Sequence, residues 1–430
     1  MSKTRRTGSA LARDSIWMFL GQASQTVIRG AYFVIIARAL GPEEYGAFAA
    51  VTALAAILSP FASWGAGPLL IQTVVRCRSA FRVSWGNALL TNVMCAVALS
   101  LFIVASAHIL FPASIPLELI ALIAISDLLF ARVVETGAMA YQAFGQIRNA
   151  ALLKAVPSVA KAVGASWLWL STVSPSALEW GVVYSVGTAA AGVFAVVWVS
   201  GDLGRPAVGR SSEWIAWKQG FYFAIGLSSQ NVYNNIDKTM LARLSTLDAT
   251  GIYAAAYRVL EVAFVPIRSV VYAAYARFFQ AGIKGLYGSV ALARKILPFG
   301  VAYALVVAAG LVILAPAIPA VLGEDYREAV TAIRLMAGVP LLRTLHYFPA
   351  DALSGGGHQA LRSGSQVSVA LLNVALNAWL IPRYSWGGAV VATLVSDGTL
   401  VLLLWLVIWR TRRPAQYHLF APLPEDSDAG

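Results

Sequence analysis

Charged side chains inside long apolar stretches are the residues of this chain that could do chemistry. The cations are Arg29, Arg132, Lys161, Lys238, Arg258, Arg268, Arg334 and Arg343. The acids are Asp127, Glu135, Asp237, Glu261, Asp351 and Asp397. A charge at the centre of a bilayer costs about 2.5–3.5 kcal/mol on insertion scales, so such residues face a protein interior or a hydrated cavity, or pair with one another.

Four of these cations are predicted to form a cationic cavity for an anionic substrate group: Arg29, Lys161, Arg258 and Arg268. Arg29 and Lys161 have no acid within a turn on their own predicted helices. Arg258 can instead pair with Glu261, three residues later on one helix face. Arginine holds phosphate oxygens with two parallel hydrogen bonds, and a low-dielectric cavity strengthens that attraction. The pattern therefore predicts a binding site for an anionic group such as a phosphate.

Amide side chains near these charges are predicted to line the same hydrated cavity. Two glutamines precede Arg29 on its helix, and a polar run over 230–237 is too polar to face lipid. Two asparagines four residues apart, at 373 and 377, either bind sugar hydroxyls or hold neighbouring helices together. The predicted polar lining consists of Gln22, Gln25, Gln230, Asn234, Asn373 and Asn377.

Two acids are candidates for coupling a conformational change to a proton or Na⁺ gradient. Asp237 ends the polar run and is the first candidate, and Asp397 is the second. A buried acid can couple in this way if one conformational state is favoured only when the acid is occupied. Adjacent Lys238 offers the alternative of a local charge pair, although neighbours on a helix point about 100° apart. Arg334 and Arg343, like Lys238, lie near predicted span ends, from which long side chains can reach the membrane surface.

The elements that position these residues are predicted to be membrane-spanning helices. The 430 residues are 59% hydrophobic and 12% charged, about half the charge of a soluble protein, and their mean hydropathy is +0.70. Apolar runs long enough to cross a bilayer recur along the whole chain. Turn residues divide it into twelve spans, roughly 15–39, 46–73, 85–111, 116–141, 151–172, 177–200, 217–241, 250–275, 296–321, 330–353, 364–381 and 387–409. The fold class is an all-α polytopic membrane protein.

The distribution of lysine and arginine predicts the orientation of these spans. With a cytoplasmic N-terminus, twenty of these residues fall in inner segments and four in outer loops. Positive charge is retained on the cytoplasmic side of membrane proteins. We therefore expect a multi-pass protein of a cytoplasmic membrane with both termini in the cytoplasm. The net charge of +12 is then a topology signal rather than evidence for nucleic-acid binding.

An internal repeat predicts two six-helix lobes. The hairpin that begins at Trp17 recurs 205 residues later, where a Ser-Gln pair (24–25 and 229–230) and an Ala-Arg pair (37–38 and 242–243) return without a gap. Repeats of this kind are the usual architecture of secondary transporters, with the substrate between them. The predicted parts are an N-terminal lobe over 1–204, a C-terminal lobe over 205–413 and a disordered cytoplasmic tail over 414–430.

The sequence lacks the motifs that several classes of function require. Neither the two cysteines nor the four histidines have metal-ligand spacing, and the glycine run at 355–357 lacks the Lys-Ser/Thr of a phosphate-binding loop. No metal site or organic cofactor is expected. A membrane-embedded polysaccharide polymerase or glycosyltransferase would need catalytic acids in a sizeable loop, whereas the predicted outer loops have about four to eight residues. The chain is therefore expected not to be an enzyme.

Three motifs together resemble one protein family. The sequence Ala-Arg-Ala-Leu-Gly-Pro-Glu-Glu-Tyr-Gly over 37–46 resembles the first hairpin of bacterial polysaccharide exporters and O-antigen flippases. These Wzx-like proteins belong to the multidrug/oligosaccharidyl-lipid/polysaccharide (MOP) superfamily. Asn-Ile-Asp-Lys over 235–238, with Gly-Ile-Tyr over 251–253, resembles the start of the family's second lobe. Leu-Ile-Pro-Arg-Tyr over 380–384, followed by Gly-Gly-Ala over 387–389, resembles its penultimate hairpin.

The resemblance implies an alternating-access flippase for a lipid-linked oligosaccharide, usually built on undecaprenyl pyrophosphate, in surface polysaccharide assembly. Its implied partners are that substrate, the bilayer and other membrane proteins of polysaccharide assembly. It also implies a cationic central cavity and an acidic position at Asp237. The lipid II flippase branch has two additional C-terminal helices, and the drug-exporting branch has an acid where this chain has Arg29, so both fit less well. An ion-coupled exporter of a drug or another lipid is the alternative.

Overall fold

The computed structural model is helical throughout its described part. It describes the backbone of residues 2–209, 213–283 and 285–411. Side chains are described from residue 25 onward, except at 213–219, 222, 223, 225–227, 229, 230, 272, 273 and 276. No strand occurs within these ranges, which agrees with the predicted all-α fold class. The predicted tail over 414–430 lies outside them.

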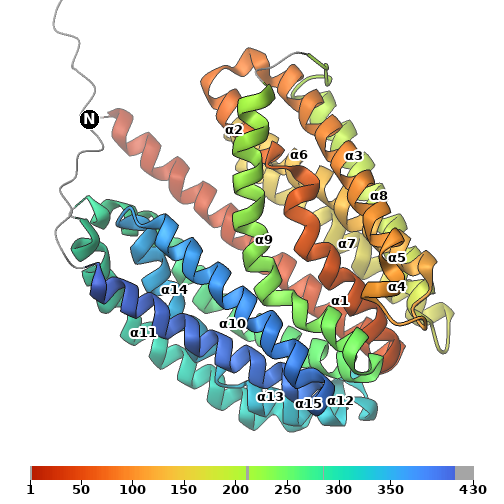
Figure 1. Cartoon of the computed structure of the whole chain (residues 1–430). Helices are drawn as coiled ribbons and strands as arrows, with labels where there is room; N and C mark the ends of the chain where they lie inside the picture. The colour runs from red at the N-terminus through yellow and green to blue at the C-terminus, as the bar shows by residue number, and fades with distance from the viewer. Residues whose placement is uncertain (1, 210–212, 284, 412–430) are drawn as a thin grey trace, which may run out of the picture. The chain divides into compact units, whose positions relative to one another are not determined.

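The helices follow one another with short connections (Figure 1). Those before residue 205 are α1 (Ser2–Ser63), α2 (Ala66–Arg76), η1 (Arg78–Ala80), α3 (Phe81–Ala105), α4 (Ala107–Leu110), α5 (Leu117–Ile125), the π-helical turn η2 (Ser126–Phe130), α6 (Ala131–Ala143), α7 (Ile147–Ser171) and α8 (Ala177–Asp202). Those after it are α9 (Glu213–Leu244), α10 (Leu247–Gly282), α11 (Gly285–Leu314), η3 (Ala315–Ala317), α12 (Ile318–Leu322), η4 (Glu324–Tyr326), α13 (Arg327–Met336), α14 (Val339–Gly355) and α15 (Gln359–Arg410).

The chain packs into two compact units, which are described separately here. The first unit comprises 1–262, 313–336 and 370–392. The second comprises 263–312, 337–369 and 393–430. The first unit therefore holds α1 to α9 and the start of α10. The two-lobe division at residue 205 stays a prediction.

Five segments of the described chain are long and apolar enough to cross a membrane. They are Gln25–Arg76, Arg78–Ala105, Ala177–Asp202, Gly285–Leu322 and Gln359–Arg410. The first and the last have 52 residues each, which is more than twice the roughly 20 residues that one crossing needs. Large apolar side chains such as Leu101, Phe299 and Val306 are more than half exposed, as lipid-facing residues are. The count of twelve spans stays a prediction.

Both of the longest helices contain a sharp break, and each break lies between two of the predicted spans. In α1 only Gly41 leaves the helical conformation, with φ 72° and ψ 173°. It lies between the predicted spans 15–39 and 46–73, and the next helix begins at Pro42, whose fixed φ suits the first helical position. In α15 the break falls at Ser385, with φ 51° and ψ −135°, between the predicted spans 364–381 and 387–409.

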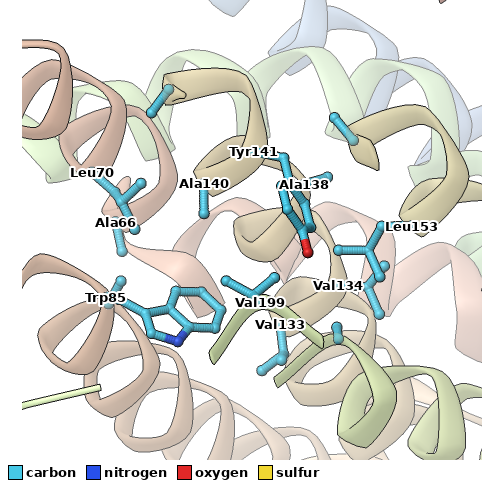
Figure 2. Close-up of a cluster of buried hydrophobic side chains, with 14 of the residues drawn as sticks. Ala66, Leu70, Trp85, Val133, Val134, Ala138, Ala140, Tyr141, Leu153 and Val199 are labelled. Carbon is cyan, nitrogen blue, oxygen red and sulfur yellow. The ribbon is translucent and has the colours of Figure 1, made fainter. Parts of the chain in front are cut away.

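The early helices of the first unit enclose a well-packed apolar core. Its buried residues come from α2, α3, α6, α7 and α8. Figure 2 shows the rings of Trp85 and Tyr141 among Leu70, Leu153 and Val199. The indole nitrogen of Trp85 donates a hydrogen bond to Ser200 Oγ at 3.2 Å, so the one polar atom of this large side chain is satisfied. This core is a rigid scaffold for the polar residues on the neighbouring helices.

The sequence repeat reappears as a symmetric contact within the first unit. Helices α1 and α9, which begin the two repeats, pack along each other. A Cβ atom at Gly46 would overlap the carbonyl oxygen of Leu247, and one at Gly251 would overlap that of Pro42. Residues 42 and 247 are repeat equivalents, and so are 46 and 251. The contact is therefore self-complementary, as across a two-fold axis, and only glycine permits so close an approach.

The repeated Ala-Arg pairs form a second symmetric contact. Arg38 Nη1 donates to the carbonyl oxygens of Ala320 and Val321 in α12, at 3.2 and 3.3 Å. Its repeat equivalent, Arg243, donates from Nε to the carbonyl oxygen of Ile109 in α4, at 3.0 Å. Helices α4 and α12 are the short helices that follow the long α3 and α11. Each arginine thus binds the end of a short helix in the other repeat. The carbonyls that it binds there have no hydrogen-bond partner within that helix.

Candidate functional site

Three of the four predicted substrate-binding cations lie in one region of the first unit. Lys161 on α7 is within electrostatic reach of both Arg29 on α1 and Arg258 on α10. We call these three residues the cationic cluster. The fourth, Arg268, lies on the part of α10 that belongs to the second unit. The structure therefore brings Arg29, Lys161 and Arg258 together across three helices, as a site for an anion requires.

Among the described side chains, Arg29 is bound by neutral groups. Its Nε donates to Ser158 Oγ on α7 at 3.3 Å, and its Nη2 lies 3.5 Å from Gln25 Oε1, one turn earlier on α1. Gln25 itself is buried, and Arg29 is exposed. An incoming anion therefore does not have to displace a carboxylate of the described residues from this guanidinium.

Lys161 lies against an aromatic ring. Its Nζ is 3.7 Å from the centroid of the Tyr184 ring on α8, well within cation–π distance. The hydroxyl of Tyr184 donates in turn to Asp127 Oδ1 at 2.7 Å. Tyr184 also packs edge-on against Trp180 and Phe48. Aromatic surface thus adjoins the positive charge, a combination that suits a substrate with both a sugar and an acidic group.

Arg258 does form the local pair that the spacing allowed. Its Nη1 lies 2.9 Å from Glu261 Oε2, and both side chains are partly exposed. The positive charge of Arg258 also acts on the hydroxyl of Tyr45, which is buried on α1. The carboxylate of Glu261 therefore offsets part of the positive charge that Arg258 contributes to the cationic cluster.

The predicted polar lining is only partly brought together. Asn234 Oδ1 lies 3.4 Å from the Tyr257 hydroxyl, which donates to it. Asn373 and Asn377 are buried, and Asn377 Nδ2 donates to Asn373 Oδ1 at 3.0 Å, an arrangement that also fits a structural pair. The side chains of Gln22 and Gln230 lie outside the described residues.

Asp237 is buried on α9 and both of its oxygens have donors. The hydroxyl of Tyr253 donates to Oδ2, and the backbone N–H of Lys238 donates to Oδ1 at 2.8 Å. Lys238 Nζ lies 3.6 Å from Oδ1, so the local charge pair forms despite the unfavourable spacing. The same amine lies 3.8 Å from the Tyr257 ring centroid and donates to the Asn234 carbonyl oxygen. Lys238 is 8% exposed, so the expectation that it reaches the membrane surface is wrong.

Asp397 belongs to a buried triad in the second unit. Arg343 Nε lies 3.7 Å from Asp397 Oδ2, and His346 Nε2 lies 3.3 Å from Oδ1. Arg343 is 5% exposed, which also overturns the expectation that it reaches the surface. Neither oxygen of Asp397 accepts a hydrogen bond from the described side chains or backbone. Arg334, by contrast, is exposed on α13.

Two residues of these sites have roles that the sequence did not reveal. Asp127 was evident as an unpaired acid in an apolar stretch, but nothing linked it to Tyr184 or Lys161. His346 carries no local motif, and only its contact with Asp397 places it in a charged group. Among the described residues, no group of three or more His, Cys, Asp or Glu side chains could hold a metal ion.

The family of the chain follows from a match to one family model. That model, described as polysaccharide biosynthesis protein, matches residues 11–281, which is more than half of the chain. The chain belongs to the polysaccharide biosynthesis protein family. Comparison with curated proteins gave no significant sequence match.

Solved structures share the fold of this family member over nearly its whole length. The lipid II flippase MurJ, in an inward closed conformation, has a TM-score of 0.75 at 12% identity, covering 93% of this chain and 87% of that one. An inward-facing multidrug resistance transporter of the MATE family has a TM-score of 0.72 at 15% identity, covering 90% and 96%. A MOP superfamily transporter from Pyrococcus furiosus, described as having a binding pocket of reverse polarity, has a TM-score of 0.63 at 16% identity, covering 94% and 96%.

These likenesses show the fold alone, because the identities are low. The predicted polytopic membrane fold is confirmed, and so is the resemblance to proteins of polysaccharide biosynthesis. The chain is thus a multi-pass membrane protein of a polysaccharide biosynthesis family with a transporter fold. The roles of its individual site residues stay predictions.

Proposed function

We propose that this protein is an alternating-access flippase that moves a polyprenyl-pyrophosphate-linked oligosaccharide across the bacterial cytoplasmic membrane. The substrate would enter from the cytoplasm, where both termini lie, and be released on the outer face for surface polysaccharide assembly. Membership of the polysaccharide biosynthesis family supports the pathway, and the MOP fold supports transport rather than catalysis. Other membrane proteins of polysaccharide assembly would receive the flipped substrate.

The observation that carries the proposal is the cationic cluster. Arg29, Lys161 and Arg258 come from three helices, and of these only Arg258 has a carboxylate of the described residues within ion-pair distance. Such charges are costly in a membrane unless a hydrated cavity or an anionic partner offsets them. A pyrophosphate supplies that partner, because the guanidinium groups can bind its oxygens with paired hydrogen bonds and the ammonium can act as a point charge.

A buried acid would supply the driving force. Asp237 and Asp397 are both nearly inaccessible to solvent. Binding of a proton or Na⁺ at either acid would change the charge of its surroundings, and so could favour one access state. Asp397 lacks hydrogen-bond donors on both oxygens within the described chain, whereas Asp237 already has them. We therefore expect Asp397 to respond more strongly to occupancy than Asp237.

The test is export of surface polysaccharide in a strain that lacks the chromosomal copy. Arg29→Ala and Lys161→Ala should abolish surface polysaccharide while the protein is produced normally, and Arg29→Lys should retain part of the activity because it keeps the charge. Arg334→Ala is the matched control, since this cation is exposed on α13 and should be dispensable. Normal export by both alanine variants of the cluster would refute the proposal.

The competing function is ion-coupled export of a drug or another lipid. It shares the fold, as the MATE transporter shows, but a cluster of three cations would repel the cationic compounds that a drug exporter handles. The same strains separate the two functions. Loss of drug resistance with unchanged polysaccharide would favour the competing function.

A further inference from the structure

A chain of three side chains links an acid to the cationic cluster without an ion pair. Asp127 accepts a hydrogen bond of 2.7 Å from the Tyr184 hydroxyl, and the Tyr184 ring lies 3.7 Å from Lys161 Nζ. Lys161 forms no ion pair with a carboxylate of the described residues. Asp127 nevertheless acts electrostatically on Lys161. The acid thus attracts the ammonium without an ion pair, and Tyr184 contacts both groups.

The backbone around Asp127 is also unusual. Residues Ser126–Phe130 form a π-helical turn between α5 and α6. Turns of this kind are rare, widen a helix locally, and frequently occur at functional sites. Here the turn packs against both α1 and α8, the helices that carry Arg29 and Tyr184. The site of the irregular backbone and the site of the unusual charge contact therefore coincide.

The three cations of the cluster differ in how firmly their present partners hold them. Arg258 is paired with Glu261 at 2.9 Å, and Arg29 is bound by the neutral side chains of Ser158 and Gln25. The arrangement of Lys161 is intermediate between these two, because Tyr184 holds its ammonium by a cation–π contact. The hydrogen bond from Tyr184 to Asp127 polarises the ring and so strengthens that contact. Like Arg29, Lys161 can exchange its partner for a substrate oxygen without breaking an ion pair, and Lys161 is the one whose aromatic partner is hydrogen-bonded to an acid.

We propose that Asp127 acts through Tyr184 as an internal counter-ion of Lys161, and that the anionic group of the substrate competes with it for the ammonium. This inference rests on the proposed function. In the empty protein Lys161 lies over the Tyr184 ring. When an anion binds, the ammonium turns toward it, and the negative charge of Asp127 limits how tightly the anion is held. Asp127 is therefore a positioning residue that favours release rather than binding.

The inference predicts opposite effects on affinity and transport. At an effective dielectric constant of about 20, a unit charge about 10 Å away changes the binding of another by roughly tenfold. Asp127→Asn removes that charge, yet the amide oxygen still accepts the Tyr184 hydrogen bond, so the local fold is kept. The dissociation constant for pyrophosphate should fall roughly tenfold, while polysaccharide export should decrease because release becomes slower. A merely structural role would weaken both.

The experiment measures inorganic pyrophosphate binding by calorimetry, with the full-length protein in lipid nanodiscs at constant ionic strength. Asp127→Asn should bind more tightly in the wild-type background and show little gain when Lys161 is replaced by alanine. Tyr184→Phe, which keeps the ring and loses the link to Asp127, should give a smaller gain of the same sign. Glu135→Gln is the matched control, since that acid pairs with Arg132 on α6.

The outcomes distinguish the two proposals. If Lys161→Ala loses pyrophosphate binding but Asp127→Asn binds like the wild type, the counter-ion role is wrong and the flippase proposal stands. An Asp127→Asn variant that loses both affinity and export would assign the residue a structural role and overturn the inference. If neither the wild type nor Asp127→Asn binds pyrophosphate, the pyrophosphate site fails, and the counter-ion role fails with it.

Discussion

The two repeat-related arginines give the most direct test of the internal symmetry. Arg38 and Arg243 each bind the terminal carbonyls of a short helix in the other repeat. Replacing either with alanine should loosen the junction between the repeats at that end of the first unit. Replacing both should loosen it symmetrically, and alternating access requires such a junction to open and close.

The magnitude follows from the hydrogen bonds. Bonds to a charged donor contribute about 1.5–3 kcal/mol when they are buried. Both arginines are exposed, so we take about 1 kcal/mol for each, as for favourable surface interactions. The two sites share no partner, so their effects should add to about 2 kcal/mol. The open population should then rise about fivefold in each single variant and about thirtyfold in the double variant.

Thiol accessibility measures this population. Cys77 and Cys95, the two cysteines of the chain, are first replaced by serine. A new cysteine at Ala254, which is 4% exposed and lies one turn beyond the close approach at Gly251, reports opening of the junction. Its reaction with a membrane-impermeant maleimide should accelerate about fivefold for each single variant and about thirtyfold for the double variant.

A matched control separates this effect from general loss of charge. Arg327 pairs with Glu324 in its own loop, its side chain is 79% exposed, and Arg327→Ala should leave the labelling rate unchanged. An unchanged rate in the double variant would show that the arginines do not hold the junction. An effect confined to Arg38 would show that the contacts are not equivalent, and would refute the symmetry argument.

Two further predictions concern topology and coupling. Cysteines placed at Ser114 and Ser174 should react with an impermeant maleimide from outside the cell. Native Cys77 should react only in inside-out vesicles. Its exposed thiol is a reactive probe, because hydrogen bonding by Ser79 lowers the pKa of that thiol. The reverse labelling pattern would overturn the proposed orientation. Asp397→Asn should be produced and bind substrate but no longer respond when the proton or Na⁺ gradient is collapsed, and Asp237→Asn should show the same defect more weakly. Transport by both variants with a normal gradient response would place the coupling site elsewhere.

The sequence by itself determined the features that depend on short stretches of chain. Apolar runs, turn residues and the lysine and arginine distribution indicated a helical membrane protein. The repeat of residues 37–46 at 242–251 was visible because a structure used twice needs the same residues twice. The repeat includes Arg38, Gly46 and their equivalents, and the structure shows that these are residues of the two self-complementary contacts. The local pair of Arg258 and Glu261 was likewise predictable from helical spacing.

Tertiary structure decided the features that depend on partners distant in sequence. Arg38 finds its carbonyl partners 282 and 283 residues away, and Arg29 finds Ser158 at a separation of 129, so no local pattern could reveal them. The burial of Lys238 and Arg343 was missed because position along a span does not say which helix covers a side chain. The π-helical turn that carries Asp127 has no signature in its own residues. Its role beside Tyr184 and Lys161 arises only because packing brings three helices to one point, where the cost of burying charge is offset by mutual contact.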